Sequence, residues 1–176
     1  MEPLKGGRLA PPTPAPIQAI WDAYPVKRSP VEWALRFVWD DARVSLLLSG
    51  MSTMEQIVEN VALAERGHAA SLTAADHELI ARVKDAYRAR IAVDCTKCRY
   101  CMPCPQGIEI PMILSLVNDA SLFESLAEEK RAYDMEVSLK HTASASECTE
   151  CGQCEGACPQ QLEVIKELAN AARLFE

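Results

Sequence analysis

The chain has 176 residues, of which 49% are hydrophobic and 24% are charged, and its formal net charge is -7 at pH 7. This composition is typical of a globular protein with a modest core, and it excludes disordered and collagen-like chains. The acidic balance also argues against a nucleic-acid binder, because neutralisation of phosphates by Lys and Arg dominates that affinity. We therefore expect no nucleic acid among the partners.

The cysteines and the N-terminus indicate the compartment. All eight cysteines lie between Cys95 and Cys158. The opening residues, MEPLKGGRLAPPTPAP, lack the apolar stretch of a signal peptide, and no apolar run reaches the roughly 18 residues that span a bilayer. We therefore expect a cytoplasmic protein with no membrane span, in which clustered, reduced cysteines bind metal or carry out redox chemistry.

The first clear helix signal follows Ser29. This serine is a typical N-cap, a proline comes next at the first helical position, and Glu32 stands at the third, which is the pattern of a capping box. The predicted helix runs to about Asp40 and is apolar nearly all round. Such a helix should be buried on more than one side.

A strand and a second helix are predicted next. Residues 44–48, with the sequence VSLLL, form a short continuous apolar run that is typical of a parallel strand covered on both faces. Ser52 and Glu55 predict another capping box, which opens a helix that ends near Arg66. Helix, strand and helix with short connections indicate an α/β unit.

Beyond Arg66 every predicted element is helical. Thr73 is the expected N-cap of a connector helix, with Asp76 at its third position. Apolar spacing predicts three more helices, around residues 113–117, 126–137 and 162–174. No strand is expected after Cys95.

Two cysteine runs carry the strongest signal. The first run, from Cys95, reads CTKCRYCMPCP, and the second, from Cys148, reads CTECGQCEGACP. Each contains three cysteines at intervals of three and then a fourth that precedes proline. The second run matches the bacterial ferredoxin pattern, and the first is one residue shorter before its last cysteine.

The spacing predicts two [4Fe–4S] clusters whose fourth ligands are exchanged. Three thiolates at such intervals can reach three irons of one cluster, and in two-cluster proteins the fourth cysteine ligates the other cluster. The predicted ligand sets are Cys95, Cys98, Cys101 and Cys158 for one cluster, and Cys148, Cys151, Cys154 and Cys104 for the other.

Other uses of the cysteines are less favoured. Zinc would use CxxC pairs with longer gaps, disulfides between such close cysteines would close strained loops, and a separate redox CxxC motif fits less well still. Each oxidised cluster with its four thiolates contributes about -2, which takes the net charge to about -11. That charge favours a basic electron-transfer partner.

Three stretches of the chain resemble one enzyme family, and together they extend the match over nearly the whole chain. The stretch CTKCRYCMPCPQGIEIP resembles the tail of the iron–sulfur branch of the aldo/keto reductases, and MEPLKGG and VSLLLSGMSTMEQIVEN resemble the seventh-strand end and the eighth strand with its helix in their (β/α)8 barrel. The resemblance implies that residues 1–66 are the C-terminal portion of the barrel, 67–94 a helical connector and 95–176 a two-cluster, ferredoxin-type helical domain. The expected fold is therefore mostly α, with the last βα unit of a barrel followed by an α-helical iron–sulfur domain.

The resemblance also implies a nucleotide site. In that family the loop and helix after the eighth strand hold NAD(P)(H), and a capped helix N-terminus points free N–H groups at an anion. Carried over by position, the residues are Leu4, Gly6, Ser49, Gly50, Met51, Ser52, Gln56, Glu59 and Asn60. The chain holds no stretch that matches the family's catalytic Asp, Tyr, Lys and His. We therefore expect nucleotide binding only when the rest of the barrel is supplied, and no catalytic residue.

Two functions follow from these patterns. The first is the electron-transfer module of an aldo/keto reductase-like oxidoreductase, whose partner is a redox protein or the missing catalytic part of the barrel. The alternative is a non-catalytic interaction or structural protein whose clusters stabilise the fold and which docks onto a partner barrel. Exposed apolar faces at Trp33, Phe37 and Leu46 predict self-association.

Overall fold

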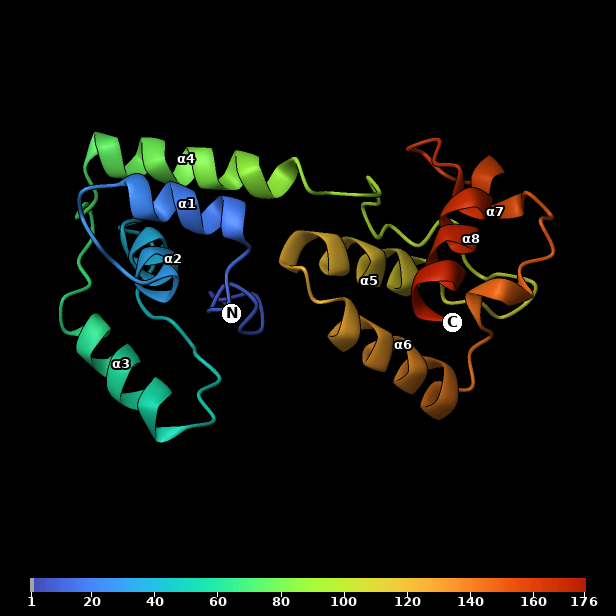
Figure 1. Cartoon of the computed structure of the whole chain (residues 1–176), viewed down its shortest axis with the longest axis horizontal. Helices are drawn as coiled ribbons and strands as arrows, with labels where there is room; N and C mark the ends of the chain where they lie inside the picture. Colours follow the sequence, from blue (N-terminus) through green and yellow to red (C-terminus); the bar gives the residue numbers. More distant parts are fainter. Residues whose placement is uncertain (1) are drawn as a thin grey trace. The chain divides into compact units, whose positions relative to one another are not determined.

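The computed structural model describes residues 2–176 and divides the chain into two compact units, the first ending at Tyr87 and the second running from Arg88 to Glu176 (Figure 1). The first unit contains α1 (Ala15–Ala23), α2 (Pro30–Trp39), α3 (Met54–Ala64) and nearly all of α4 (Ala74–Arg88). The second contains α5 (Ile110–Phe123), α6 (Leu126–Lys140), the short 3-10 helix η1 (Ala145–Glu147), α7 (Gln153–Gly156) and α8 (Val164–Phe175).

The fold is mostly helical. Over residues 2–176 no β-strand is formed, and one isolated parallel bridge joins Ile108 and Ala143. None of the helices in this described part is both long enough and apolar enough to cross a membrane.

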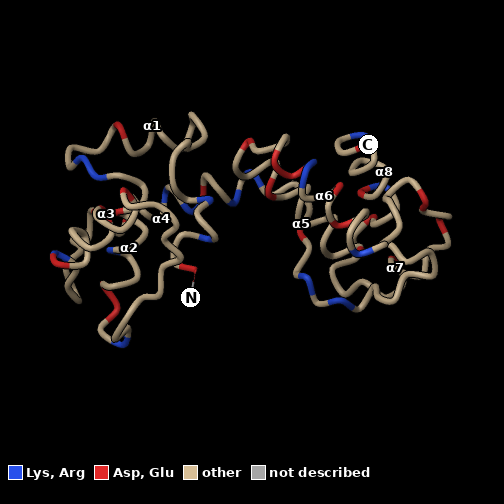
Figure 2. The backbone as a smooth tube through the Cα atoms, turned by 90° about the horizontal axis from the view of Figure 1, so that it is seen from below, with Lys and Arg blue, Asp and Glu red and all other residues tan. Residues whose placement is uncertain are grey.

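Figure 2 shows acidic and basic residues in both units. The boundary between the units, after Tyr87, falls within the connector predicted for residues 67–94.

The first unit has a core of aromatic and aliphatic side chains. Ile17 and Trp21 of α1 pack against Trp33 of α2 and against Leu79 and Val83 of α4. The rings of Trp21 and Trp33 are stacked, with centroids 5.5 Å apart. Full burial of an aliphatic side chain such as Ile17 contributes about 1.5–3 kcal/mol. Trp33 is only 2% exposed, so the prediction of a surface tryptophan there was wrong.

Helix α2 begins as predicted. The Ser29 side chain accepts a hydrogen bond from the backbone N–H of Glu32 at 3.0 Å. The Glu32 carboxylate, however, accepts from Arg36 at 2.8 Å instead of returning to the cap. A second apolar cluster, of Val31, Leu35 and Leu63, joins α2 to α3.

The caps of the next two helices are reciprocal. In α3 the cap is Thr53, whose hydroxyl accepts from the Gln56 N–H at 3.3 Å while the Gln56 amide oxygen accepts from the Thr53 N–H at 3.4 Å. The predicted box of Ser52 and Glu55 was therefore one residue too early. Before α4, Thr73 is the cap as predicted, and it exchanges a pair of hydrogen bonds with Asp76.

The strand predicted at residues 44–48 is not formed, so this part of the fold prediction was wrong. The segment is irregular, Leu46 is 67% and Leu48 59% exposed, and only Leu47 packs against the cluster around Val31. A strand needs a neighbouring strand for its N–H and C=O groups, and the described residues provide none. The expected barrel end, a last βα unit, is therefore absent from the part of the chain that the structure describes.

In the second unit, α5, α6 and α8 pack together. Ile113 and Val117 of α5, Tyr133 of α6, and Leu168 and Phe175 of α8 are all buried in one cluster. The rings of Tyr133 and Phe175 lie 5.3 Å apart. This core holds the ends of the two cysteine loops in place.

Candidate metal centre

The first cysteine loop is irregular and repeatedly turns through left-handed backbone. It lies between Val93 and α5, and Lys97 and Arg99 have φ angles of 56° and 67°. In the second loop, Glu150 and Gly152 have φ angles of 55° and 74°. Such angles are uncommon for residues other than glycine and cost about 1–3 kcal/mol each. They turn the chain between successive cysteines, so that several thiols of one loop face the same cavity.

Two cavities in the second unit are lined by cysteines. Cys95, Cys98, Cys101 and Cys158 line the first cavity. The second is lined by Cys104, Cys148, Cys151 and Cys154, together with Cys101. Each cavity thus brings together four cysteines that the spacing assigned to one cluster. Cys101 and Ile110 line both cavities.

The walls between the thiols are mainly apolar. Ile110, Pro111 and Leu114 of α5 and Val164 of α8 line the first cavity, and Ile165 and Leu168 of α8 line the second. Ile110 and Val164 are each 1% exposed. The apolar walls exclude water from the side of the cavities that faces the core.

Burial affects the chemistry of two thiols. The pKa of Cys101 and the pKa of Cys154 are both raised, chiefly because burial disfavours the thiolate and further because other charged groups lie nearby. The backbone N–H of Lys97 donates a hydrogen bond to Cys95 Sγ at 3.5 Å. Since iron binds the thiolate form, metal binding at these cavities releases protons.

The donor set fits an iron–sulfur cluster. All eight cysteines are free thiols, and cysteine thiolates are the ligands that hold [4Fe–4S] clusters. No three His, Cys, Asp or Glu side chains of residues 2–176 are arranged to hold a single metal ion. A [4Fe–4S] cluster does not need that arrangement, because each of the four thiolates binds a different iron atom of the cluster.

The residues proposed for the nucleotide are occupied with local contacts. Asn60 donates to Ser49 Oγ at 3.2 Å, Gln56 caps α3, Glu59 accepts from Ser29 Oγ at 3.3 Å, and Leu4 packs in the cluster of α2 and α3. Glu59 lines a polar cavity. The other residues proposed for the nucleotide are Gly6, Gly50, Met51 and Ser52. Neither the cysteine cavities nor the polar cavity nor the apolar cavity of the first unit brings the whole proposed set together.

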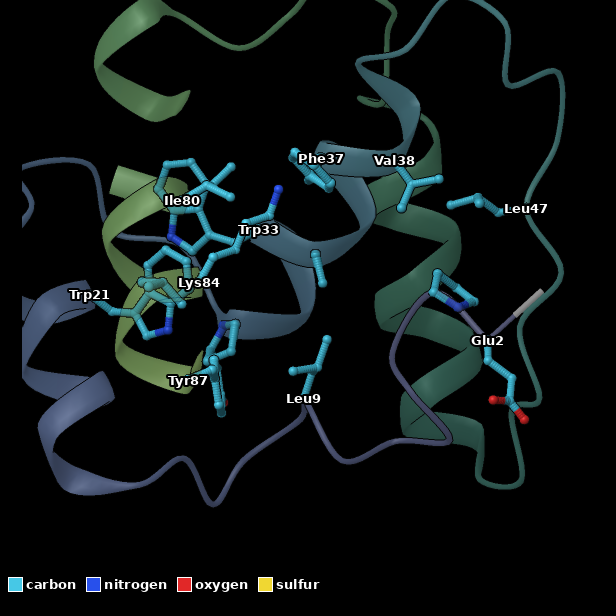
Figure 3. A pocket seen from close by; sticks show the side chains of 14 residues that line it. Glu2, Leu9, Trp21, Trp33, Phe37, Val38, Leu47, Ile80, Lys84 and Tyr87 are labelled. Carbon is cyan, nitrogen blue, oxygen red and sulfur yellow. The ribbon is translucent and has the colours of Figure 1, made fainter. Parts of the chain in front are cut away.

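The first unit also contains an apolar cavity that the sequence did not predict. Its volume is about 440 Å³, and Trp21, Trp33, Phe37 and Tyr87 are among the side chains that surround it (Figure 3). The Lys84 amine lies 4.0 Å from the centroid of the Phe37 ring. These residues come from α1, α2 and α4, so no local pattern could have identified them.

Comparisons with known proteins bear on the second unit. No curated protein and no solved structure matches the chain. Residues 94–163 match the family of 4Fe-4S dicluster domains, and this segment contains all eight cysteines. Residues 94–163 therefore form a 4Fe-4S dicluster domain of the ferredoxin type.

Proposed function

We propose that the dicluster domain is an electron-transfer module that binds two [4Fe–4S] clusters. The observation that carries the proposal is the pair of cavities, each lined by four cysteines that the spacing assigned to one ligand set. Bound clusters of this type store and transfer single electrons. The chain supplies the thiolates, and the apolar side chains of α5 and α8 limit the access of water.

The exposure of the cysteines supports a route for electrons. Cys98 of the first set and Cys151 of the second are exposed, whereas Cys154 is buried and the other cysteines are partly buried. Each site therefore approaches the protein surface at one ligand. Electron exchange with a partner takes place at these two points.

The ligand sets can be tested by anaerobic reconstitution with iron and sulfide. The wild-type chain should contain about eight iron atoms, four for each cluster. Exchange of the fourth ligands predicts that Cys158→Ala reproduces the absorbance and EPR spectra of Cys98→Ala, and that Cys104→Ala reproduces those of Cys151→Ala. Gln160→Ala, which changes a lining residue that is not a thiol, should retain both clusters.

Two results would contradict the proposal in different ways. A colourless protein with stoichiometric zinc and no iron would refute the binding of clusters. If Cys158→Ala instead matches Cys151→Ala, the clusters bind but the ligand sets are assigned wrongly.

The wider context of the module is also a proposal. Its place in a cytoplasmic aldo/keto reductase-like oxidoreductase, with a redox protein or the rest of a barrel as partner, is supported by the sequence resemblance alone. NAD(P)(H) would bind only with that partner present. We expect the chain alone to show no oxidation of NADPH, and robust turnover by the purified chain would contradict this view.

A second candidate function is docking onto a partner barrel, and the surface of α3 favours it. Met54, Ile57, Val58 and Val61 are 68%, 39%, 62% and 52% exposed. Their spacing of i, i+3, i+4 and i+7 places them on one face of the helix. Leu46 and Leu48, in the unpaired segment before α3, are exposed as well. A parallel sheet edge could pair with such a segment and cover such a helix face.

Self-association provides a test of this face. We expect sedimentation equilibrium to show concentration-dependent association of the wild-type chain and weaker association of Val58→Lys. Glu55→Gln, on the same helix, changes the charge by the same amount and should associate like the wild type. Equal behaviour of both variants and the wild type would refute association through this face of α3.

A further inference from the structure

The two cysteine cavities differ in the charges that surround them. Arg99 lines the first cavity, and apart from the cysteines it is the one charged residue among those that line either cavity. Its guanidinium donates two hydrogen bonds to Glu109, at 2.5 Å to Oε1 and 3.2 Å to Oε2. Glu109 itself does not line the cavity. Of the two members of the ion pair, the positive one thus belongs to the residues that line the cavity.

The backbone at the first site acts in the same direction. Lys97 donates its N–H to Cys95 Sγ, and a hydrogen bond to a cluster ligand stabilises added negative charge. Beside the second site, Glu155 follows Cys154 and accepts a hydrogen bond from the backbone N–H of Ile165 at 2.9 Å. Ile165 lines that cavity. Glu155 itself does not line the cavity, so the two sites differ in that Arg99 lines the first and no charged residue other than the cysteines lines the second.

We infer that the Arg99–Glu109 ion pair sets the reduction potential of the site formed by Cys95, Cys98, Cys101 and Cys158 and holds it above that of the other site. The inference rests on the proposed binding of two clusters. Reduction adds one electron from an external one-electron donor to a site that is already anionic, and no bond is made or broken. A nearby positive charge favours the added electron and a negative charge opposes it. The first electron taken up by the domain therefore resides beside Arg99.

The ion pair allows a test in which the two partners have opposite effects. Arg99→Gln removes the positive charge and leaves the Glu109 carboxylate unpaired, so it should lower the midpoint potential of the higher-potential site. Glu109→Gln leaves Arg99 unbalanced and should raise that potential. The double variant should return close to the wild-type value. In each case the potential of the other site should shift less.

The measurement is an anaerobic redox titration followed by EPR, on full-length protein that contains about eight iron atoms per chain. A matched control uses the ion pair between Arg90 and Glu124, at 2.8 Å in the same unit, neither of which lines a cavity. Arg90→Gln and Glu124→Gln should leave both potentials unchanged.

The outcomes separate this inference from the proposed function. Protein that takes up no iron would refute the binding of clusters. In loaded protein, shifts of the same sign for Arg99→Gln and Glu109→Gln, no shift for either, or equal shifts at both sites would overturn the role of the ion pair. If Arg99→Gln does not assemble, the sign of the Glu109→Gln shift decides, because that variant leaves the cysteine loop unchanged.

Discussion

Asp76 is a buried carboxylate that ties the start of α4 to the end of α1. It is 3% exposed and accepts hydrogen bonds from Tyr24 Oη at 2.9 Å, from the Thr73 N–H at 2.9 Å and from Thr73 Oγ1 at 2.8 Å. Arg28 Nη1 lies 3.6 Å from Oδ1. Asp76→Ala removes the acceptor of the Tyr24 and Thr73 groups, whereas Arg28 keeps Glu32 as a second carboxylate, with its Nε 3.6 Å from Glu32 Oε1.

The expected cost is large for a unit of this size. A buried donor that is left without its acceptor costs about 1–3 kcal/mol, and Asp76→Ala does this to both the Tyr24 hydroxyl and the Thr73 N–H. We therefore expect Asp76→Ala to lower the free energy of unfolding by about 3–5 kcal/mol. In Asp76→Asn the amide oxygen still accepts hydrogen bonds but its NH₂ group faces other donors, so a loss of about 1–3 kcal/mol is expected. Glu78→Ala removes an exposed carboxylate from the same helix and should stay within about 0.5 kcal/mol of the wild type.

Tryptophan fluorescence during urea unfolding measures this effect in the first unit alone. The chain has three tryptophans, Trp21, Trp33 and Trp39, and all precede the boundary after Tyr87. We expect the midpoint of the fluorescence transition to fall by on the order of 2 M urea in Asp76→Ala, with an unchanged slope. A midpoint within error of the Glu78→Ala control would refute the reasoning.

Acid provides an independent check on Asp76. Burial raises the pKa of its carboxyl, but the hydrogen bonds from Thr73 and Tyr24 and the charge of Arg28 outweigh burial, so the pKa lies below its ordinary value of 3.8. A carboxyl whose pKa is depressed by folding stabilises the folded state at pH values above the pKa that it has in the unfolded chain. This stabilisation is lost as the pH falls through the pKa of the folded state. The wild type should therefore lose stability below about pH 4, and Asp76→Asn should lose less. Parallel acid profiles of the two proteins would contradict this assignment.

Three further substitutions test the packing. Tyr133→Phe removes the hydroxyl that accepts from the Ala145 N–H at 2.6 Å, and it should destabilise the second unit by about 1–3 kcal/mol. Cluster absorbance should then be lost at a lower urea concentration, and an unchanged midpoint would count against this contact. Gly67→Ala would place Cβ 2.5 Å from Trp39 Cε3, and this overpacking should cost about 1–3 kcal/mol. The urea transition followed by tryptophan fluorescence measures the loss, and wild-type stability would show that the ring moves freely. Ile110→Ala should lower the free energy of unfolding of the second unit by about 2–5 kcal/mol. It should also speed the loss of iron to a chelator from both sites, because Ile110 lines both cavities. Faster loss from one site only would be inconsistent with that position.

Local signals in the sequence predicted the helix starts. Ser29 and Thr73 cap their helices as expected, because a cap depends on side chains only three residues away. The start of α3 was predicted one residue early, since Ser52 and Thr53 are both good caps and the Gln56 amide oxygen accepts from the N–H groups of both. The hydrogen bond from the Gln56 N–H to the Thr53 hydroxyl makes Thr53 the cap.

Interactions between distant segments could not be predicted from local patterns. Helix α1 has nine residues, and it is buried mainly through Ile17 and through the stacking of Trp21 on Trp33. For residues 44–48, the apolar run matched a buried strand, but a strand also requires a partner in space. The cysteine spacing predicted two sets of four thiols, whereas the presence of Cys101 in the walls of both cavities follows from the fold.

The position of Cys101 has a consequence for electron tunnelling. Because one cysteine and one isoleucine line both cavities, the gap between two redox centres held there is fixed within a single stretch of chain. In the proposed two-cluster domain, the rate of electron hopping between the clusters would then be set by the core of the domain itself. A partner that exchanges one electron at a time and a reaction that needs two electrons could both use the same reservoir.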